Sequence, residues 1–303
     1  MLWLTVTIVA YLIMAVVFLV DKYLLTSAIP NPKVYAFLIG IAGVFLILLI
    51  PFVDFYIPSF WQLFLSFWAG ATFVLALFWF FKDLQKFNVS QVVPAIGALT
   101  PLFTFFLVYI FSCGKETLSF YEIIAFVILI IGSILVTFEK EKLVDLPSLK
   151  LSLIAAFLFS LSFVLTKYVY LEQPFLNGLI WTRLGGALLA LFLFILWPDI
   201  KKEIFVQKDG LKKKSLGLVV ANQAVGAGAG ILQNWAIALA PLAYIAFINA
   251  LQGVQYAFLL ILSVFLSFKF PQILKEFVSK KIIIQRVIAI LLIGLCLALL
   301  AIK

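Results

Sequence analysis

The sequence predicts an all-α membrane protein in which ten transmembrane helices form two inverted five-helix repeats. Hydrophobic residues make up 66% of the chain and charged residues only 12%, whereas soluble domains average roughly 45–50% and about 25%. The apolar residues form continuous runs rather than an alternating pattern, which favours helices over the strands of a membrane barrel. Small and charged residues that recur in both halves of the chain indicate the repeats.

Ten apolar runs reach the length of about 20 residues that an α-helix needs to cross a bilayer. Proline-rich or charged segments separate them, such as residues 30–32, 139–150 and 198–215. The runs cover residues 2–21, 33–53, 60–81, 87–111, 119–138, 149–171, 175–197, 215–238, 241–267 and 281–302.

Several residues of the first half recur in the second half in the same order. A shift of 145 positions (185 − 40) aligns the first two helices of each half, and a shift of 156 (226 − 70) aligns the next two. The aligned pairs include Lys22 and Lys167, Gly40 and Gly185, Gly70 and Gly226, and Trp79 and Trp235. We therefore predict one repeat in residues 1–140 and a second in 149–303. Because each repeat crosses the membrane an odd number of times, the two must be inverted, as in transporters with a substrate site near the midplane.

The distribution of Lys and Arg predicts the orientation and accounts for the formal net charge of +9. Eighteen of these residues lie in or beside the loops that follow odd-numbered helices, and only Lys115, Lys167 and Lys303 lie on the other side. Basic residues between apolar runs orient helices in a membrane, so they do not indicate a nucleic-acid partner. The excess predicts that the odd-to-even loops are cytoplasmic and that both chain ends are outside.

The end of the first repeat contains the segment FSCGKETL, with Gly114 and Glu116, followed by an apolar run that includes Gly132. Arg183 lies early in the second helix of the second repeat. Together with the repeats, these residues resemble the drug/metabolite transporter superfamily in its ten-helix EamA-like branch. The second repeat departs from that pattern, with residues 269–276 in place of a compact Gly–Glu pair. The resemblance implies a carrier of amino acids or related metabolites with cytoplasmic chain ends, opposite to the lysine distribution, so the orientation stays open.

Arg183 is the one arginine well inside an apolar run, about eight residues into residues 175–197. An arginine at the centre of a membrane helix costs roughly 2.5–3.5 kcal/mol on insertion scales, so its side chain should face protein or water. It could bind an anionic group of a substrate, for which the planar guanidinium is suited. It could equally be a structural residue that caps carbonyls or reaches toward the interface.

Polar residues at helical spacing are a second candidate for the substrate site. They could line a cavity, or they could form hydrogen bonds between helices worth about 0.6 kcal/mol on average. Gln91 begins such a face in the fourth run, where Pro94 and Pro101 should also kink the helix. In the ninth run the residues that should share one face are Asn249, Gln252, Gln255 and Tyr256.

Two aromatic residues and two glycine-rich segments complete the candidate positions. Trp79 and Trp235 could form a stacking wall for an organic substrate, or they could belong to the aromatic belt at the membrane interface. The segments 226–230 and 185–186 predict close contacts between helices. The first is not a phosphate loop, because no Lys-Ser or Lys-Thr follows it.

The sequence contains no His, only two Cys and no acid clearly in the middle of an apolar run. It therefore offers no metal cluster, His-based triad or pair of catalytic acids, and we expect no enzyme activity, no cofactor and no metal. The predicted function is a multi-pass transporter of the cell membrane (plasma or inner) that moves a small polar or amphiphilic organic metabolite by alternating access. Its predicted partners are that substrate and the lipid bilayer, without nucleic acid. The alternatives are a translocase or transferase for a lipid-linked headgroup and a non-transporting membrane subunit. The substrate, coupling ion, direction and oligomeric state stay open.

Overall fold

The computed structural model describes residues 2–25, 32–87, 89–137, 146–198, 200–201, 213–269 and 280–301, and every regular element in these ranges is a helix. The side chains of some residues inside helices, Gln91 among them, lie outside the description. The elements are α1 (Leu2–Leu25), α2 (Pro32–Ala42), η1 (Gly43–Phe52), α3 (Phe60–Lys86), α4 (Val89–Phe111), α5 (Phe120–Thr137), α6 (Leu146–Glu172), α7 (Phe175–Leu196), α9 (Lys213–Leu239), η2 (Leu242–Tyr244), α10 (Ile245–Ala250), α11 (Gln252–Lys269) and α12 (Lys280–Ala301).

The described helices begin and end close to the predicted apolar runs, and two of the runs are subdivided. The run 33–53 forms α2 followed by the 3₁₀ helix η1, which contains Pro51. Proline lacks the backbone N–H that a continuing α-helix requires. The run 241–267 forms η2, α10 and α11, with a turn at Leu251 between the last two. The sequence pattern did not predict this second break.

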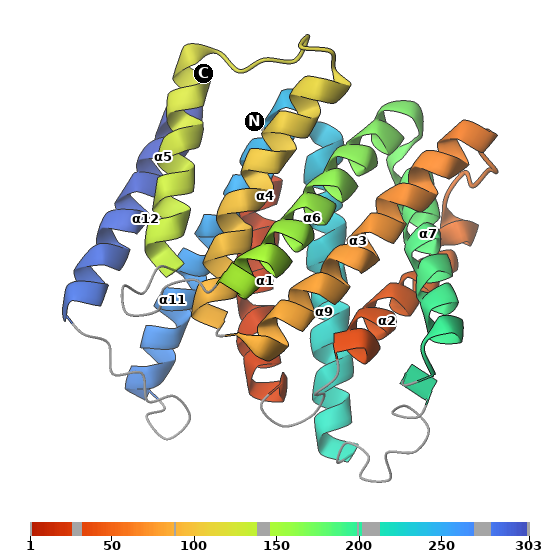
Figure 1. The fold of residues 1–303 in the computed structure, drawn as a ribbon, viewed down its shortest axis with the longest axis horizontal. Coiled ribbons are helices and arrows are strands. Elements are labelled where there is room, and N and C mark those ends of the chain that lie inside the picture. Colours follow the sequence, from red (N-terminus) through yellow and green to blue (C-terminus); the bar gives the residue numbers. More distant parts are fainter. Residues whose placement is uncertain are drawn as a thin grey trace.

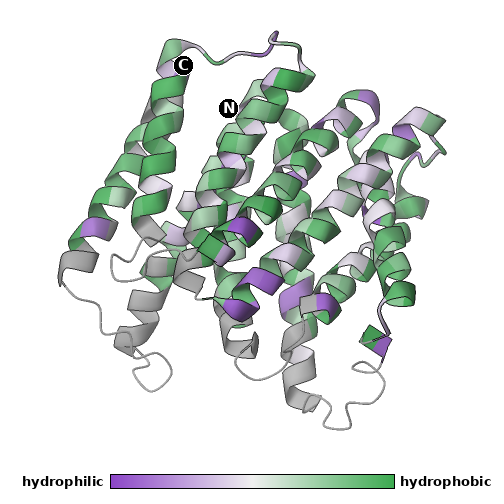
Figure 2. Ribbon diagram, viewed as in Figure 1, coloured by the Kyte–Doolittle hydropathy of each residue, from purple (hydrophilic) through white to green (hydrophobic). Residues whose placement is uncertain are grey.

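Four segments are long and apolar enough to cross a membrane, namely Phe60–Lys86, Leu146–Glu172, Phe175–Leu196 and Leu242–Leu259. Five shorter apolar helical segments accompany them in the described part of the chain. Apolar residues cover most of the ribbon in Figure 2, and large apolar side chains such as Leu48, Phe60 and Leu188 are exposed on the outside of the bundle. These features are those of a helical membrane protein. The tenfold crossing and the inversion of the repeats stay predictions.

The two halves of the chain interlock rather than forming separate cores. α3 packs on α6 and α7, α4 on α6 and α10, α1 on α9 and α11, and α5 on α12 (Figure 1). Each of these contacts joins a helix from residues 2–137 to one from residues 146–301. The two ends of the chain lie on the same side of the bundle as the turn between α4 and α5 (Figure 1).

The closest approach between α3 and α7 is made by glycines. A Cβ on Gly70 would overlap the carbonyl oxygen of Thr182 and lie 2.5 Å from the backbone nitrogen of Gly186. A Cβ on Gly185 would lie 2.5 Å from the Cα of Phe67. The close contact predicted for residues 185–186 is therefore confirmed, because only residues without a side chain let the two backbones approach this closely.

The glycine segment of α9 differs from this prediction. A Cβ on Gly226 would meet only the side chain of Val17, at 3.3 Å, and no atom lies within 4 Å of the corresponding position on Gly228. The expectation of a close helix contact is thus wrong for Gly228. The pattern of small residues in α9 is the same as in a packed helix, but a pattern on one helix does not specify whether a partner helix reaches it.

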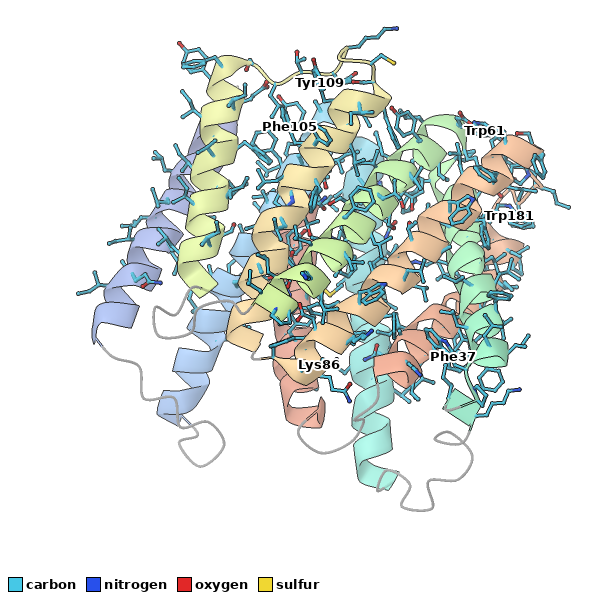
Figure 3. The ribbon with its side chains drawn as sticks, viewed as in Figure 1. Phe37, Trp61, Lys86, Phe105, Tyr109 and Trp181 are labelled. Carbon is cyan, nitrogen blue, oxygen red and sulfur yellow. The ribbon has the colours of Figure 1, made fainter. Side chains whose placement is uncertain are left out.

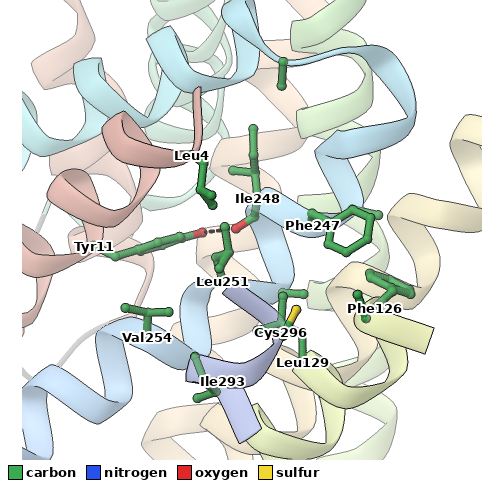
Figure 4. Packing of buried hydrophobic residues seen from close by; sticks show 14 of the residues in the cluster. Leu4, Tyr11, Phe126, Leu129, Phe247, Ile248, Leu251, Val254, Ile293 and Cys296 are labelled. Atoms are coloured by element: carbon green, nitrogen blue, oxygen red, sulfur yellow. Dashed lines mark hydrogen bonds between the residues drawn. The ribbon is translucent and has the colours of Figure 1, made fainter. Parts of the chain in front are cut away.

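The largest buried apolar cluster surrounds the short helix α10. Phe247, Ile248 and Leu251 are fully buried, and Phe126 of α5 packs edge-on against Phe247 (Figure 4). The break after α10 frees backbone carbonyls from helical pairing. One of these, at Ile248, accepts a hydrogen bond of 2.9 Å from the Tyr11 hydroxyl of α1. The break is therefore held in the interior by neighbouring helices.

Candidate functional site

Asn249, predicted to line a cavity, lies in the interior between α10 and α4. Its Nδ2 donates a hydrogen bond of 2.8 Å to Oγ1 of Thr104, which in turn donates to the carbonyl of Thr100. Only 2% of the residue is exposed. This geometry matches the alternative reading of Asn249 as a hydrogen bond between helices, with its side chain enclosed by protein.

The other three residues of the predicted face belong to α11, because the turn at Leu251 separates them from Asn249. Gln255 and Tyr256 are buried, and Gln252 is half-buried. The Tyr256 ring lies against Gly97 of α4, where a Cβ would be 3.4 Å from the ring. The predicted single face is therefore divided between two helices, although α4 does lie opposite as expected.

The two tryptophans are far from forming one wall. Trp79 packs on α4 residues near the end of α3, and the Lys82 ammonium lies 4.3 Å from the centre of its indole ring. Trp235 is on the exposed side of α9, near the end of that helix where α10 follows. Since α3 and α9 run in opposite directions, the two residues lie toward opposite ends of the bundle (Figure 1). The remaining predicted residue, Gln91, lies outside the described side chains.

Trp61 and Trp181 lie toward the end of the bundle that carries the turn between α6 and α7, whereas Phe37 and Lys86 lie toward the opposite end (Figure 3). The Trp181 indole donates a hydrogen bond of 3.0 Å to the carbonyl of Tyr56 and stacks on Phe55. This arrangement fastens the segment before α3 to α7.

Arg183 is half-buried in α7 and faces α3, α6 and α9. Its guanidinium carbon is 5.4 Å from the centre of the Phe73 ring, and its Nη2 is 3.6 Å from the position that a Cβ on Gly230 would take. The Tyr170 phenol of α6 lies nearby. Among the described residues, no hydrogen bond or ion pair engages the guanidinium. A cation at this depth is therefore left with aromatic and neutral neighbours, although it can donate five hydrogen bonds.

Tyr170 and Asn234 form the polar wall beside Arg183. The Tyr170 hydroxyl donates a hydrogen bond of 2.8 Å to Oδ1 of Asn234, whose Nδ2 donates to the carbonyl of Gly230, also at 2.8 Å. These bonds fix the orientation of both side chains. The Tyr170 oxygen keeps its acceptor capacity, and Gly230 leaves the space next to the guanidinium free of a side chain of its own.

A second polar pair lies on the adjacent residue of α9. Gln233 Nε2 donates a hydrogen bond of 3.3 Å to the Tyr11 hydroxyl, which itself donates to the carbonyl of Ile248. The segment 230–234 of α9 therefore has Arg183 beside Gly230 and Tyr11 of α1 beside Gln233.

We define the candidate site as Arg183, Phe73, Tyr170, Gly230 and Asn234, which come from α7, α3, α6 and α9. Of these, only Arg183 was predicted to bind substrate. Tyr170 could have been suspected as a polar ring in an apolar run, three residues after Lys167 on the same helical face. Phe73 carried no signal, because the sequence contains 33 phenylalanines.

The buried acids of the described helices are occupied elsewhere. Asp83 accepts hydrogen bonds from the hydroxyls of Ser148 at 2.9 Å and Ser152 at 2.5 Å. Glu122 accepts from the backbone N–H of Ser119 at 2.7 Å and from the Tyr244 hydroxyl. The described residues include no group of three or more His, Cys, Asp or Glu side chains that could hold a metal ion.

Comparison with known proteins establishes the fold but not the family. No protein-family model matches the sequence, and no curated protein matches it. In all, 28 chains of solved structures match. One of them, described only as the crystal structure of a protein, is 16% identical, covers 97% of this chain and 96% of its own, and superposes with a TM-score of 0.69. At this identity the likeness shows a shared fold alone, over nearly the whole length of both chains.

Proposed function

We propose that this protein is a multi-pass transporter of the cell membrane that moves a small polar or amphiphilic organic metabolite by alternating access. The observation that carries the proposal is Arg183, a cation inside an apolar bundle that none of the described residues engages in a hydrogen bond or ion pair. Charged residues within membrane helices are costly and mark substrate or ion pathways. A substrate with an anionic group would supply the missing partner.

The arrangement of the helices supports the same proposal. α3 and α9 are equivalent in the predicted repeats and run in opposite directions, and Trp79 and Trp235 accordingly lie toward opposite ends of the bundle (Figure 1). Both chain ends lie on one side, as an even number of crossings requires. Inverted repeats around a central site suit alternating access. We further propose membership of the drug/metabolite transporter superfamily, on the strength of the sequence resemblance.

A carrier rather than an enzyme is proposed because the groups at the candidate site are those of recognition. Guanidinium, phenol and amide side chains bind and orient a solute, and none of the three is poised beside a general base or nucleophile. The two buried acids of the described helices are bound to Ser and Tyr partners away from Arg183.

The test is transport by the purified full chain in liposomes against a panel of organic acids, amino acids, amines and neutral metabolites. We expect uptake or efflux of at least one class, and an Arg183→Ala variant should lose it at least tenfold. The matched control is Lys115→Ala, which removes a cation from the exposed turn after α4 and should transport like the wild type. Melting of both variants in detergent verifies folding.

Full transport by a folded Arg183→Ala variant would show that Arg183 is structural and would remove the main support for this site. If Gln252→Ala also transported normally, the predicted α11 face would have no part in binding either.

A further inference from the structure

We propose that the Arg183 site selects substrates with a net negative charge, namely organic carboxylates without a neighbouring ammonium group, over amino acids of the same shape. This inference rests on the transporter proposal for its biological meaning. It goes further in that it names the chemical class of the ligand.

Three buried charges are balanced at helix ends. Asp83 accepts hydroxyl hydrogen bonds close to the start of α6, and Glu122 accepts a backbone N–H at the start of α5. Lys167, only 4% exposed, donates a hydrogen bond of 2.9 Å to the carbonyl of Ala238 in the last turn of α9. Acids near helix starts and bases near helix ends are both stabilised by the helix dipole. These groups need no ligand.

Arg183 has neither a hydrogen-bond partner among the described residues nor a helix end beside it. It lies in the interior of α7, eight residues after the helix begins at Phe175, so the helix dipole contributes little there. Its described neighbours are the Phe73 ring, the Tyr170 phenol and Gly230. The site therefore has an excess positive charge in apolar surroundings, where charges interact more strongly than in water.

A carboxylate is the group that best balances this excess positive charge. Its two oxygens can accept parallel hydrogen bonds from a guanidinium, which gives geometry as well as attraction. The hydroxyl of Tyr170 is already committed as a donor to Asn234, and the guanidinium is the charged donor of the site. A Cβ on Gly230 would lie 3.6 Å from Nη2, so Gly230 itself places no side chain over the guanidinium.

An ammonium on the same ligand would find no acid at this site among the described residues. Asn234 Oδ1 and the Tyr170 oxygen are uncharged acceptors, and Arg183 already lies over one face of the Phe73 ring. The ammonium would also lie within a few bonds of the carboxylate and therefore close to the guanidinium, which repels it. A hydroxyl in its place has no such charge and can hydrogen-bond to the Tyr170 oxygen.

The experiment measures binding to the purified full chain in lipid nanodiscs with three probes of one shape. These are 2-hydroxy-4-methylpentanoate, which is anionic, leucine, which is zwitterionic, and leucinol, which is cationic. We expect the hydroxy acid to bind at least tenfold more tightly than leucine, and leucinol not to bind. At constant ionic strength, sodium chloride should compete only weakly with the hydroxy acid, because the apolar body of this probe contributes to its binding.

Two variants connect the selectivity to the site. Arg183→Gln should weaken hydroxy-acid binding at least tenfold. Arg183→Lys keeps the charge but not the planar set of N–H donors, and it should retain part of the binding. Gly230→Leu should fold, with the helical circular dichroism of the wild type, and fail to bind because its side chain fills the space beside the guanidinium. Gly230→Ala fits at the 3.6 Å distance and should bind within a few-fold of the wild type.

The outcomes separate this inference from the transporter proposal. Equal binding of the hydroxy acid and leucine, no binding of the hydroxy acid, or unchanged binding by Arg183→Gln would each overturn the charge selectivity. Chloride binding as tight as that of the hydroxy acid would overturn it as well, in favour of an inorganic anion site. If the hydroxy acid binds selectively but no organic anion crosses the liposome membrane, the selectivity stands and the transport proposal fails.

Discussion

The helices α3 and α9 are equivalent in the predicted repeats, yet they are packed differently. α3 lies along α6, α7 and α2, and Gly70 brings its backbone against that of α7. α9 lies mainly along α1, and at the equivalent glycine, Gly226, a Cβ would meet only a side chain, that of Val17. The same type of residue therefore joins two backbones on one side of the molecule and leaves room on the other.

Polar contacts hold both helices, and those of α9 include the bonds from Lys167 and Tyr170 of α6 described above. α3 is tied to α6 by the Ser162 hydroxyl, which donates a 2.7 Å hydrogen bond to the carbonyl of Ala69, and to the α6–α7 turn by Gln173, whose Nε2 donates to Ser66 at 3.1 Å. The amide of Asn222 on α9 donates a longer bond, 3.3 Å, to the carbonyl of Val17. A movement of α9 relative to α7 would break fewer backbone contacts than the same movement of α3. α9, whose backbone is the less closely packed of the two against α7, supplies Gly230 and Asn234 to the candidate site, and α3 supplies Phe73.

The largest effect is expected for Gly70→Ala. The new Cβ would overlap the Thr182 carbonyl oxygen and the Gly186 nitrogen, which are backbone atoms that cannot rotate away. The loss should be about 3 kcal/mol or more, at the upper end for overpacked sites. Unfolding in detergent, followed by tryptophan fluorescence, measures it. An unchanged unfolding midpoint would mean that α3 and α7 are not in close contact in the folded protein.

A second close contact, at Gly253, tests whether tight packing rather than location on α3 determines the loss of stability. A Cβ on Gly253 of α11 would overlap the Ser133 hydroxyl of α5 and lie 2.8 Å from its Cβ. Gly253→Ala should lose about 1–3 kcal/mol. Adding Ser133→Gly, which removes both of those atoms, should restore part of the loss. No recovery in the double variant would assign the cost to the helix break at Leu251 instead.

The positions of the helices could be predicted because hydropathy is read along the sequence and does not depend on tertiary contacts. The run 60–81 became α3 and the run 175–197 became α7, each with ends within a few residues. The break at Leu251 was missed because no proline marks that position and a single glycine nearby, Gly253, is compatible with a continuous helix. It is held by hydrogen bonds from distant helices, such as the one from Tyr11 to Ile248.

The candidate site could be predicted only at Arg183, whose charge is conspicuous in an apolar run. Its neighbours depend on how far each helix is rotated and where it crosses the next, and neither quantity is written in the pattern of one helix. Tyr170 and Asn234 meet across α6 and α9, and Phe73 is one of many equivalent rings in the sequence. Asn249 shows the reverse case, since a conspicuous amide is committed to Thr104.

A smaller effect is expected for the loss of the hydrogen bond between Asn249 and Thr104, which joins the two halves of the chain. Asn249→Ala removes the hydrogen bond to Thr104 between α10 and α4 and should cost about 1 kcal/mol, since such bonds in membranes average about 0.6 kcal/mol. Thr104→Val and the double variant complete a double-mutant cycle, whose coupling energy should be close to that average. A coupling near zero, together with lost transport in Asn249→Ala, would instead return Asn249 to the substrate pathway.

The smallest effect is expected for Gly228→Ala on α9, two residues after Gly226, which is the counterpart of Gly70. No atom lies within 4 Å of the new Cβ, and replacing an exposed helical glycine removes backbone freedom from the unfolded chain. Stability should change by no more than about 0.5 kcal/mol, in the direction of a gain. The same unfolding assay as for Gly70→Ala compares the two directly. If both variants lost stability equally, α9 would have to be packed against another helix for most of the time, and the contrast between α3 and α9 would belong to a single conformation rather than to the fold.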